Sequence, residues 1–189
     1  MKNVLKGNAA KLVGIFLIGI IAGWYLNNYY YIKFYEPSTY LQDLMEDQGS
    51  NLTRIDPVSC TASSQLNDYQ SCERLYDLDS DGWEDNNQNC KDQWIELDLG
   101  KEYLVEFVVL QNYEYEGLFA QKDKIRDFDL VLSNGVVVSN TMVDSTDSQW
   151  FDIVENTSTI RMNIQSSWNT IGTETCHLQE FEIYGRSNS

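Results

Sequence analysis

The segment "CHLQEFEIYG", from Cys176 to Gly185, decides the fold that this sequence predicts. Apolar and polar side chains alternate along much of it, which is typical of a β-strand with one buried face. The strand lies near the end of the sequence, and a cysteine stands at its start. A closing strand that is tied down in this way indicates a β-sandwich whose two ends close on each other.

Further runs of strand-forming residues, separated by turn residues, lead up to this strand. In one of them, Ile160, Met162 and Ile164 alternate with polar residues, which predicts one buried face. The run "LVEFVVL" is almost wholly apolar and predicts a central strand covered on both sides. Strands of this length and spacing predict an all-β sandwich or jelly roll with no helix through its body. The predicted strands are Trp94–Gly100, Tyr103–Tyr113, Asp127–Ser133, Gly135–Val143, Trp150–Val154, Thr159–Ser167 and the segment that begins at His177.

The charge of the chain is unevenly distributed. Residues 1–33 carry four lysines and no acid, whereas the remainder carries all 29 acids with nine bases, a net charge of −20. A body this acidic repels phosphate backbones, so nucleic acid is excluded as a partner. Docking onto anionic lipid headgroups is disfavoured for the same reason. A cation is an easier ligand for such a surface.

The N-terminal apolar segment predicts a single transmembrane helix. Leu12–Leu26 contains no charged residue, but as a helix it rises only roughly 22 Å, short of the ~30 Å hydrocarbon core. Extending it from Ala9 to Tyr31 gives about 34 Å and adds an aromatic belt at the far boundary. Three lysines precede the segment and one follows it, which places the N-terminus on the cytoplasmic or matrix side. The alternative, a cleaved signal peptide, lacks a small-x-small cleavage site.

The sequence therefore divides into four parts. Residues 1–11 form a short tail, 12–32 the transmembrane helix, 33–55 a juxtamembrane linker with a short amphipathic helix, and 56–186 the β-sandwich. Within the apolar segment, two glycines four residues apart allow a second helix to approach closely. These are Gly19 and Gly23.

Four cysteines follow the apolar segment, without a CxxC pair or the histidine spacing of a zinc site. An even number of them indicates two disulfides and an oxidising compartment, and four buried free thiols are the alternative. Two further positions, Asn51 and Asn156, match the glycosylation pattern. The cysteines are Cys60, Cys72, Cys90 and Cys176.

Several stretches resemble known domains. "TASSQLND" (Thr61–Asp68), "LYDLDSDGW" (Leu75–Trp83) and "WIELDLG" resemble the opening of discoidin, or coagulation-factor type C, domains. The second half, "KIRDFDLVLSNG" (Lys124–Gly135) and the stretch Arg161–Gly185, is similar to a SUN domain of the same galactose-binding-like superfamily. The resemblance extends from Val58 to Gly185 and implies a jelly-roll β-sandwich.

The resemblance also implies a disulfide pairing. In SUN domains, a cysteine before the final strand pairs with one that precedes the strand equivalent to "WIELDLG". Cys176 and Cys90 match those positions, which leaves Cys60 to pair with Cys72. In the chain-entropy model, the longer of these loops contributes up to ~4 kcal/mol.

The stretch "DLDSDGWED" is a candidate calcium loop. Asp77, Asp79 and Asp81 stand at alternate positions and Asp85 at the ninth, a spacing at which carboxylates can surround Ca²⁺. Discoidin-like domains often hold a structural calcium in the matching loop, completed by a glutamate of the last strand, and the resemblance assigns this role to Glu180. The alternative is a solvated acidic turn.

Catalysis is not expected, because no nucleophile elbow, zinc-protease or phosphate-loop motif is present. The single histidine, His177, stands beside a predicted disulfide, which favours a structural role. Tyr113, Tyr115 and Phe119 lie in a loop at one end of the predicted sandwich, where aromatic rings with nearby carboxylates suit sugar recognition. The alternative is that these rings pack against their own domain or a neighbouring subunit.

Two functions follow from these observations. The first is a non-catalytic, membrane-anchored interaction module, an accessory or scaffold subunit that contacts other membrane-protein subunits through its helix and its sandwich. Its sandwich would lie in an oxidising compartment: the mitochondrial intermembrane space, the cell exterior or a lumen. The alternative is a calcium-supported cell-surface lectin or adhesion protein that binds glycans.

Overall fold

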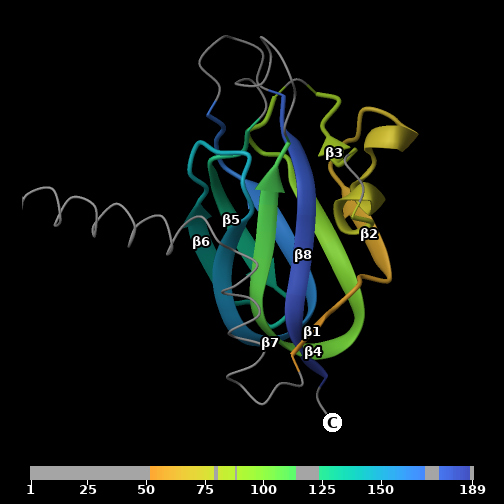
Figure 1. Cartoon of the computed structure of the whole chain (residues 1–189), viewed down its shortest axis with the longest axis vertical. Coiled ribbons are helices and arrows are strands. Elements are labelled where there is room, and N and C mark those ends of the chain that lie inside the picture. The colour runs from red at the N-terminus through yellow and green to blue at the C-terminus, as the bar shows by residue number, and fades with distance from the viewer. Residues whose placement is uncertain (1–51, 79–80, 88, 114–123, 169–174, 188–189) are drawn as a thin grey trace, which may run out of the picture. The chain divides into compact units, whose positions relative to one another are not determined.

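In Figure 1, the computed structural model describes residues 52–78, 81–87, 89–113, 124–168 and 175–187. Contacts divide the chain into Met1–Ser50 and Asn51–Ser189, and every described element belongs to the second unit. The described residues of that unit form strands and two short 3₁₀ helices, and the sequence analysis does not predict the helices. The elements are β1 (Thr53–Arg54), β2 (Ser59–Ala62), η1 (Asp68–Gln70), η2 (Cys72–Tyr76), β3 (Trp83–Glu84), β4 (Trp94–Asn112), β5 (Asp127–Leu132), β6 (Val137–Thr141), β7 (Gln149–Ile164) and β8 (His177–Ser187).

Two long, bent strands turn one hydrogen-bonded sheet into a sandwich. β4 and β7 pair antiparallel along most of their length, and both turn back at the lower end of the view in Figure 1. The first half of β4 has β2 on its other side, whereas the second half has β8. One layer therefore runs β2-β4-β7-β5-β6, and the other consists of the remaining halves of β7 and β4 with β8, β1 and β3.

The bend of β4 depends on Gly100. Its φ of +75° lies in the left-handed region, which residues with a side chain rarely adopt. A Cβ at this position would also lie 2.8 Å from Cγ1 of Val58. Asp98 supports the bend, because its Oδ1 accepts a hydrogen bond of 2.8 Å from the Gly100 amide.

The sequence analysis divides each of these long strands into two. It predicts Trp94–Gly100 and Tyr103–Tyr113 in place of β4, and Trp150–Val154 and Thr159–Ser167 in place of β7. Polar and turn-forming residues at the bends interrupt the sequence pattern, but the ladder of paired residues resumes after a register shift. β1 lies within the stretch 33–55 that the sequence assigns to the linker, since its pairing with β8 extends the sheet upstream of residue 56.

The core lies between the two layers and follows the period of the strands. In β5, Phe128, Leu130 and Leu132 are buried, whereas Asp127 and Asp129, which alternate with them, are half-buried. Each large apolar side chain that is fully buried stabilises the fold by roughly 1.5–3 kcal/mol. The largest of these side chains are Trp83, Phe128, Phe181, Leu75, Ile95 and Leu97.

Both predicted disulfides are confirmed. Cys60 is bonded to Cys72, 12 residues away, and Cys90 to Cys176, 86 residues away. Their Cα–Cα distances of 5.8 and 4.8 Å are those of ordinary disulfides. The second bond ties the start of β8 to the segment that leads into β4.

In the described parts of the chain, no helix is long and apolar enough to cross a bilayer. The predicted transmembrane segment 12–32, with Gly19 and Gly23, lies outside them. The membrane anchor and the compartment of the sandwich therefore stay predictions.

Candidate functional site

The end of the sandwich at which β4 ends and β8 begins is held by side-chain and backbone bonds. Asn112, fully buried at the end of β4, donates from Nδ2 to the Ile125 carbonyl at 3.1 Å. Its Oδ1 accepts the Ile125 amide at 2.8 Å. The Tyr113 amide donates to the carbonyl of His177 at 3.5 Å. The end of β4 is thus joined to the segment before β5 and to the start of β8.

A second set of contacts surrounds Trp168. Its amide donates to the Lys124 carbonyl at 2.9 Å, and its indole Nε1 donates to the Met142 carbonyl at 3.0 Å. The guanidinium of Arg126 lies 5.0 Å from the centre of the indole ring, a cation–π contact. Lys124 forms an ion pair with Asp144. We call the joined segments the collar: Asn112–Tyr113, Lys124–Arg126, Ser166–Trp168 and Cys176–His177.

The predicted aromatic ligand loop begins and ends at the collar. Tyr113, which is half-buried, stacks on His177 with ring centres 3.6 Å apart and planes at 8°, so one face of its ring packs within the domain, and its role as a ligand residue stays a prediction. Tyr115 and Phe119 lie outside the described residues. They stay candidate ligand residues, in a loop whose two stems are fixed.

His177 is buried beside Asp81 and Glu84, two residues of the acidic stretch that was predicted to bind calcium. Its Nε2 lies 3.1 Å from the carbonyl oxygen of Asp81, and its Nδ1 lies 3.7 Å from Oε2 of Glu84. Burial lowers the pKa of His177 to about 4, against the opposing effect of the hydrogen bond to Asp81. The ring is therefore neutral at pH 7, and Nε2 carries the proton that faces the carbonyl.

The structure brings the candidate calcium loop against the strand that carries Glu180. Trp83 pairs with Leu178 of β8, and a Cβ on Gly82 would lie 2.3 Å from the Leu178 carbonyl oxygen. This close approach, together with a φ of +62°, requires glycine at position 82. Glu180 follows Leu178 by two residues and is buried.

Two carboxylates of this loop, Asp77 and Asp85, have protein partners. Asp85, 1% exposed, accepts hydrogen bonds from the amides of Cys176 and Asn87, and Asp77 pairs with Arg74. Within the described ranges, no three acidic, histidine or cysteine side chains form a metal-binding group, and Asp79 lies outside those ranges. The calcium site stays a prediction, and Asp85 has a structural role that the sequence analysis does not predict: it holds the disulfide-bonded end of β8.

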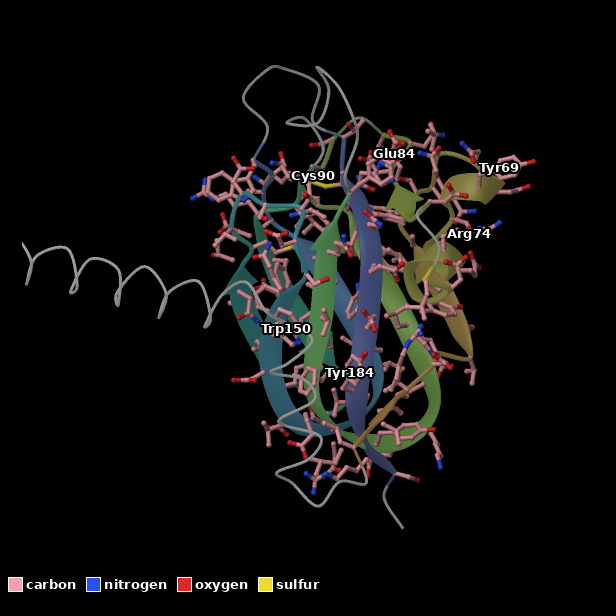
Figure 2. All side chains as sticks on the ribbon, in the orientation of Figure 1. Tyr69, Arg74, Glu84, Cys90, Trp150 and Tyr184 are labelled. Atoms are coloured by element: carbon pink, nitrogen blue, oxygen red, sulfur yellow. A yellow bond between two sulfur atoms is a disulfide. The ribbon has the colours of Figure 1, made fainter. Side chains whose placement is uncertain are left out.

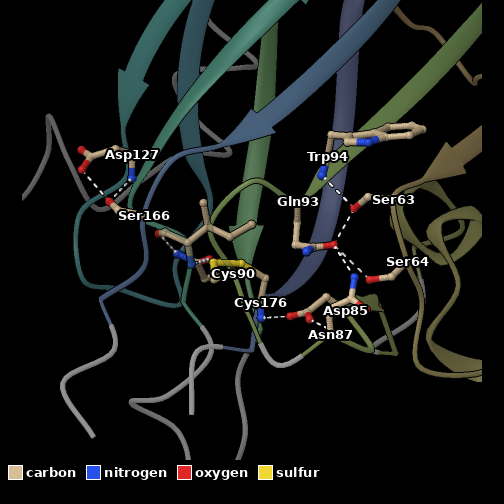
Figure 3. The surroundings of a disulfide bond; sticks show 12 residues. Ser63, Ser64, Asp85, Asn87, Cys90, Gln93, Trp94, Asp127, Ser166 and Cys176 are labelled. Carbon is tan, nitrogen blue, oxygen red and sulfur yellow. Dashed lines mark hydrogen bonds between the residues drawn. A yellow bond between two sulfur atoms is a disulfide. The ribbon is translucent and has the colours of Figure 1, made fainter. Parts of the chain in front are cut away.

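A polar network that the sequence analysis missed fixes the segment before β4 (Figure 3). Oε1 of Gln93, which is buried, accepts hydrogen bonds from the hydroxyls of Ser63 at 2.6 Å and Ser64 at 3.0 Å. The Ser63 hydroxyl oxygen in turn accepts the Trp94 amide at 3.0 Å. The one sequence signal here is "TASSQLND", which resembles a discoidin opening but does not say which partners its serines take.

Tyr69 is a further candidate contact residue that the sequence analysis did not single out. Its side chain is 73% exposed on η1 and points away from the sheets (Figure 2). η1 is tied to the same end of the sandwich, because Gln70 donates to the carboxylate of Glu84, and that carboxylate lies beside His177. An exposed aromatic ring on a fixed element is suited to contact a ligand.

No protein-family model matches the sequence, and no curated protein matches it. Solved structures match its fold. The family 32 carbohydrate-binding module (CBM) of Clostridium perfringens NanJ, in complex with galactose, matches with a TM-score of 0.59 at 14% identity, over 70% of this chain and 98% of that one. The lectin domain of lectinolysin, in complex with the Lewis B antigen, matches with a TM-score of 0.54 at 18% identity, over 72% and 98%.

A third match shows such a module within an enzyme. A truncated AlyQ chain, with CBM32 and alginate lyase domains, matches with a TM-score of 0.55 at 17% identity, over 73% of this chain and 34% of that one. At these identities the matches establish the fold alone. They confirm the predicted jelly-roll β-sandwich fold.

Proposed function

We propose that this domain, a galactose-binding-like sandwich, is a non-catalytic module that binds glycans with the loops carried by its collar. The observation that carries the proposal is the collar itself, in which four stems are bonded to one another at one end of the sandwich. Two matched modules of the same fold, those of NanJ and lectinolysin, were solved with galactose and with the Lewis B antigen.

Fixed stems favour binding for a physical reason. A loop that is held in place at both ends loses less conformational entropy when a ligand orders it, so more of the contact energy appears as affinity. The predicted loop residues Tyr115 and Phe119 supply aromatic faces, and the acidic body supplies hydrogen-bond acceptors for sugar hydroxyls.

The comparisons favour this function over the membrane-assembly subunit that the sequence analysis placed first. The matched modules carry sugar ligands, whereas the features that predict membrane partners lie in residues 1–51, outside the described part of the chain. Membrane anchoring and glycan binding are compatible. A cell-surface lectin would combine them, and the two disulfides suit the oxidising compartment that such a protein occupies.

A glycan array with the full chain in mild detergent tests the proposal. We expect retention of at least one galactose-terminated or Lewis-type glycan, and about ten-fold weaker binding when Tyr115 and Phe119 are both replaced by alanine. The control is Val58→Ala, an exposed apolar position near the opposite end of the sandwich. An array without bound glycans, or the same loss in the control variant, would contradict the proposal.

A further inference from the structure

The outer edge of β6 is an unprotected strand edge. β6 (Val137–Thr141) is the last strand of the larger layer, and among the described strands it pairs with β5 alone. An unpaired edge presents a row of backbone amides and carbonyls to any other strand, and proteins protect it with charges, proline, bulges, short strands or a covering element. The five residues of β6, "VVSNT", include no charged residue and no proline. Its side chains therefore do nothing to discourage pairing.

The other edges of the sheet are protected. β2, at the opposite side of the larger layer, contacts η2 and is bonded to it through the disulfide of Cys60 and Cys72. β1 and β3 are only two residues long. The first half of β7, at the edge of the smaller layer, carries the exposed Asp152 and a bulge between its pairs with Val105 and Phe107. Within the described part of the chain, β6 is thus the edge without such a device.

The hydrogen-bond pattern shows which backbone groups of β6 face outward. The Leu132 amide donates to the Val136 carbonyl at 2.9 Å, and the Met142 amide donates to the Arg126 carbonyl at 2.8 Å. In an antiparallel ladder, hydrogen-bonded pairs recur at every second residue, so the even-numbered residues of β6 bond to β5. The odd-numbered residues direct their amides and carbonyls away from β5. These residues are Val137, Ser139 and Thr141.

The protein itself closes this edge at both ends of β6. At the next outward-facing position, Val143, the side chain of Gln149 binds both backbone groups: Oε1 accepts the amide at 2.7 Å, and Nε2 donates to the carbonyl at 3.2 Å. At the other end the chain turns at Gly135, whose amide donates to the Leu132 carbonyl at 2.9 Å. Among the described residues, none bonds to the outward-facing backbone groups between these two points. The free edge is therefore Val137–Thr141.

A second copy of β6 fits this free edge. In an antiparallel pair with its two-fold axis at Ser139, that residue lies opposite its own counterpart, and Val137 lies opposite Thr141 of the second copy. Every outward-facing residue then meets an outward-facing residue, so the two copies exchange hydrogen bonds along the whole free edge. Val137, which is 55% exposed, would pack against a β-branched side chain. The contact uses the same surface on both copies and therefore closes as a dimer.

The charges near the edge are compatible with this pairing. Because β6 is neutral, two copies of it bring no like charges directly opposite each other, whereas a charged strand of this acidic chain would. The acid in the neighbouring strand, Asp129 of β5, lies opposite Ser139. In the dimer it is three strand spacings from its counterpart, roughly 14 Å. That distance exceeds the screening length of about 8 Å at physiological ionic strength, so the repulsion is largely screened.

We propose that β6 is the interface of a homodimer, in which two copies join their larger layers into one continuous sheet. The proposal goes beyond glycan binding, because the interface is a strand edge and not the collar. β6 runs toward the collar, since Met142, directly after it, bonds to Arg126. Antiparallel pairing therefore turns the two collars to opposite ends of the dimer. If each collar binds a glycan, which rests on the proposed function, the dimer links two glycan-bearing surfaces and does not bind one surface twice.

Sedimentation velocity of the full chain in mild detergent tests the dimer. Ser139→Pro removes an amide that faces away from β5, so it breaks the central pair of the dimer and keeps the ladder within the domain. It also removes the hydrogen bond of 2.6 Å from the Ser139 hydroxyl to Asp129. The matched control is Ser139→Ala, which loses the same hydroxyl and keeps the amide. We expect dimerisation to be about ten-fold weaker or more in Ser139→Pro and unchanged in Ser139→Ala.

A cysteine at the two-fold axis tests the register and does not depend on how well the proline variant folds. Ser139→Cys places the new thiols of the two copies opposite each other, with Cα atoms about 5.5 Å apart, within the range of a disulfide. All four native cysteines are already disulfide-bonded. The matched control is Thr141→Cys on the same face, whose counterpart lies four residues along the strand, roughly 13 Å away. Under mild oxidation, a non-reducing gel should show a covalent dimer for Ser139→Cys alone.

Three results would overturn the proposal. The first is a dimer that persists in folded Ser139→Pro, which would mean that another surface, such as the predicted helix with Gly19 and Gly23, holds it. The second is covalent coupling of Thr141→Cys as readily as of Ser139→Cys. The third is a monomer at every protein concentration, which would leave the edge to an extended segment of another protein. None of these measurements uses a glycan, so each outcome is independent of the glycan array.

Discussion

At the scale of single residues, His177 links the acidic stretch that contains Asp81 to the collar. Its ring stacks on Tyr113 and faces the Asp81 carbonyl, and burial keeps it neutral with a pKa of about 4. In the unfolded chain, a histidine has a pKa of about 6.5. Between these two values the unfolded state binds a proton that the folded state does not, so stability is lost as the pH falls.

The first prediction concerns this pH dependence. Lowering the pH from 7 to 5.5 should reduce the free energy of unfolding by about 1 kcal/mol through His177 alone, since the linkage approaches 1.4 kcal/mol per pH unit below 6.5. Urea unfolding at both pH values measures it. Because the chain has one histidine, the His177→Phe variant should lose this contribution while keeping a ring against Tyr113. A His177 resonance that titrates near pH 6.5 in the folded protein would show that the ring is not buried as described.

At the scale of elements, the bend of β4 is set by one glycine and its neighbour. Gly100 combines a positive φ with a close approach to Val58, whereas Gly135, with a φ of +86°, has no atom within 4 Å of the position of a Cβ. Alanine at position 135 would therefore report backbone strain alone, whereas alanine at position 100 would report strain and steric contact together.

The second prediction compares alanine at these two sites. Gly135→Ala should cost about 1 kcal/mol, the strain of a left-handed residue, and Gly100→Ala about 2–3 kcal/mol, because a clash adds to that strain. Chemical unfolding of both variants measures the difference. In a Val58→Ala background the two costs should become equal. Equal costs in the native background would mean that the contact with Val58 relaxes freely.

The third prediction concerns the acidic loop. If the aspartates of Asp77–Asp85 and Glu180 bind Ca²⁺, chelation should lower the melting temperature, and calcium should restore it. The gain is about 2.7 kcal/mol at one hundred times the dissociation constant. Magnesium at the same concentration should restore little, since it prefers a smaller octahedral site. A melting temperature that is unchanged through chelation and addition would leave the loop as an acidic turn.

Elements with a clear period were predictable from sequence, and elements fixed by tertiary partners were not. The strands around Phe128, Ile160 and Phe181 show apolar alternation, so their positions follow from residue order. β1 and β3 are two residues long and exist only because they pair with β8, and no sequence period can reveal them. The same holds for the collar, whose segments meet across parts of the chain that are far apart in the sequence.

At the scale of the whole molecule, two disulfides of very different span hold one domain. Cys60–Cys72 closes a local loop beside β2, whereas Cys90–Cys176 connects the segment before β4 to the start of the last strand. In the chain-entropy model, the stabilisation grows with the logarithm of the loop length.

The fourth prediction follows from this difference. Replacing Cys90 and Cys176 by alanine should cost about 4 kcal/mol, and replacing Cys60 and Cys72 about 3 kcal/mol. Thermal unfolding of the two double variants shows which disulfide contributes more to stability. The longer bond should also matter more to glycan binding, because it ends within the collar. A Cys60/Cys72 variant that loses more stability and more binding would contradict both expectations.

The pairing of β1 with the last residues of β8 places the start of the described chain at one end of the sandwich. Thr53 lies opposite Gly185, whereas the collar lies at His177, eight residues or roughly 26 Å back along the same strand. The polypeptide therefore enters the sandwich at one pole and presents its loop stems at the other. The proposed glycan-binding loops and the start of the described chain lie at opposite poles of this domain.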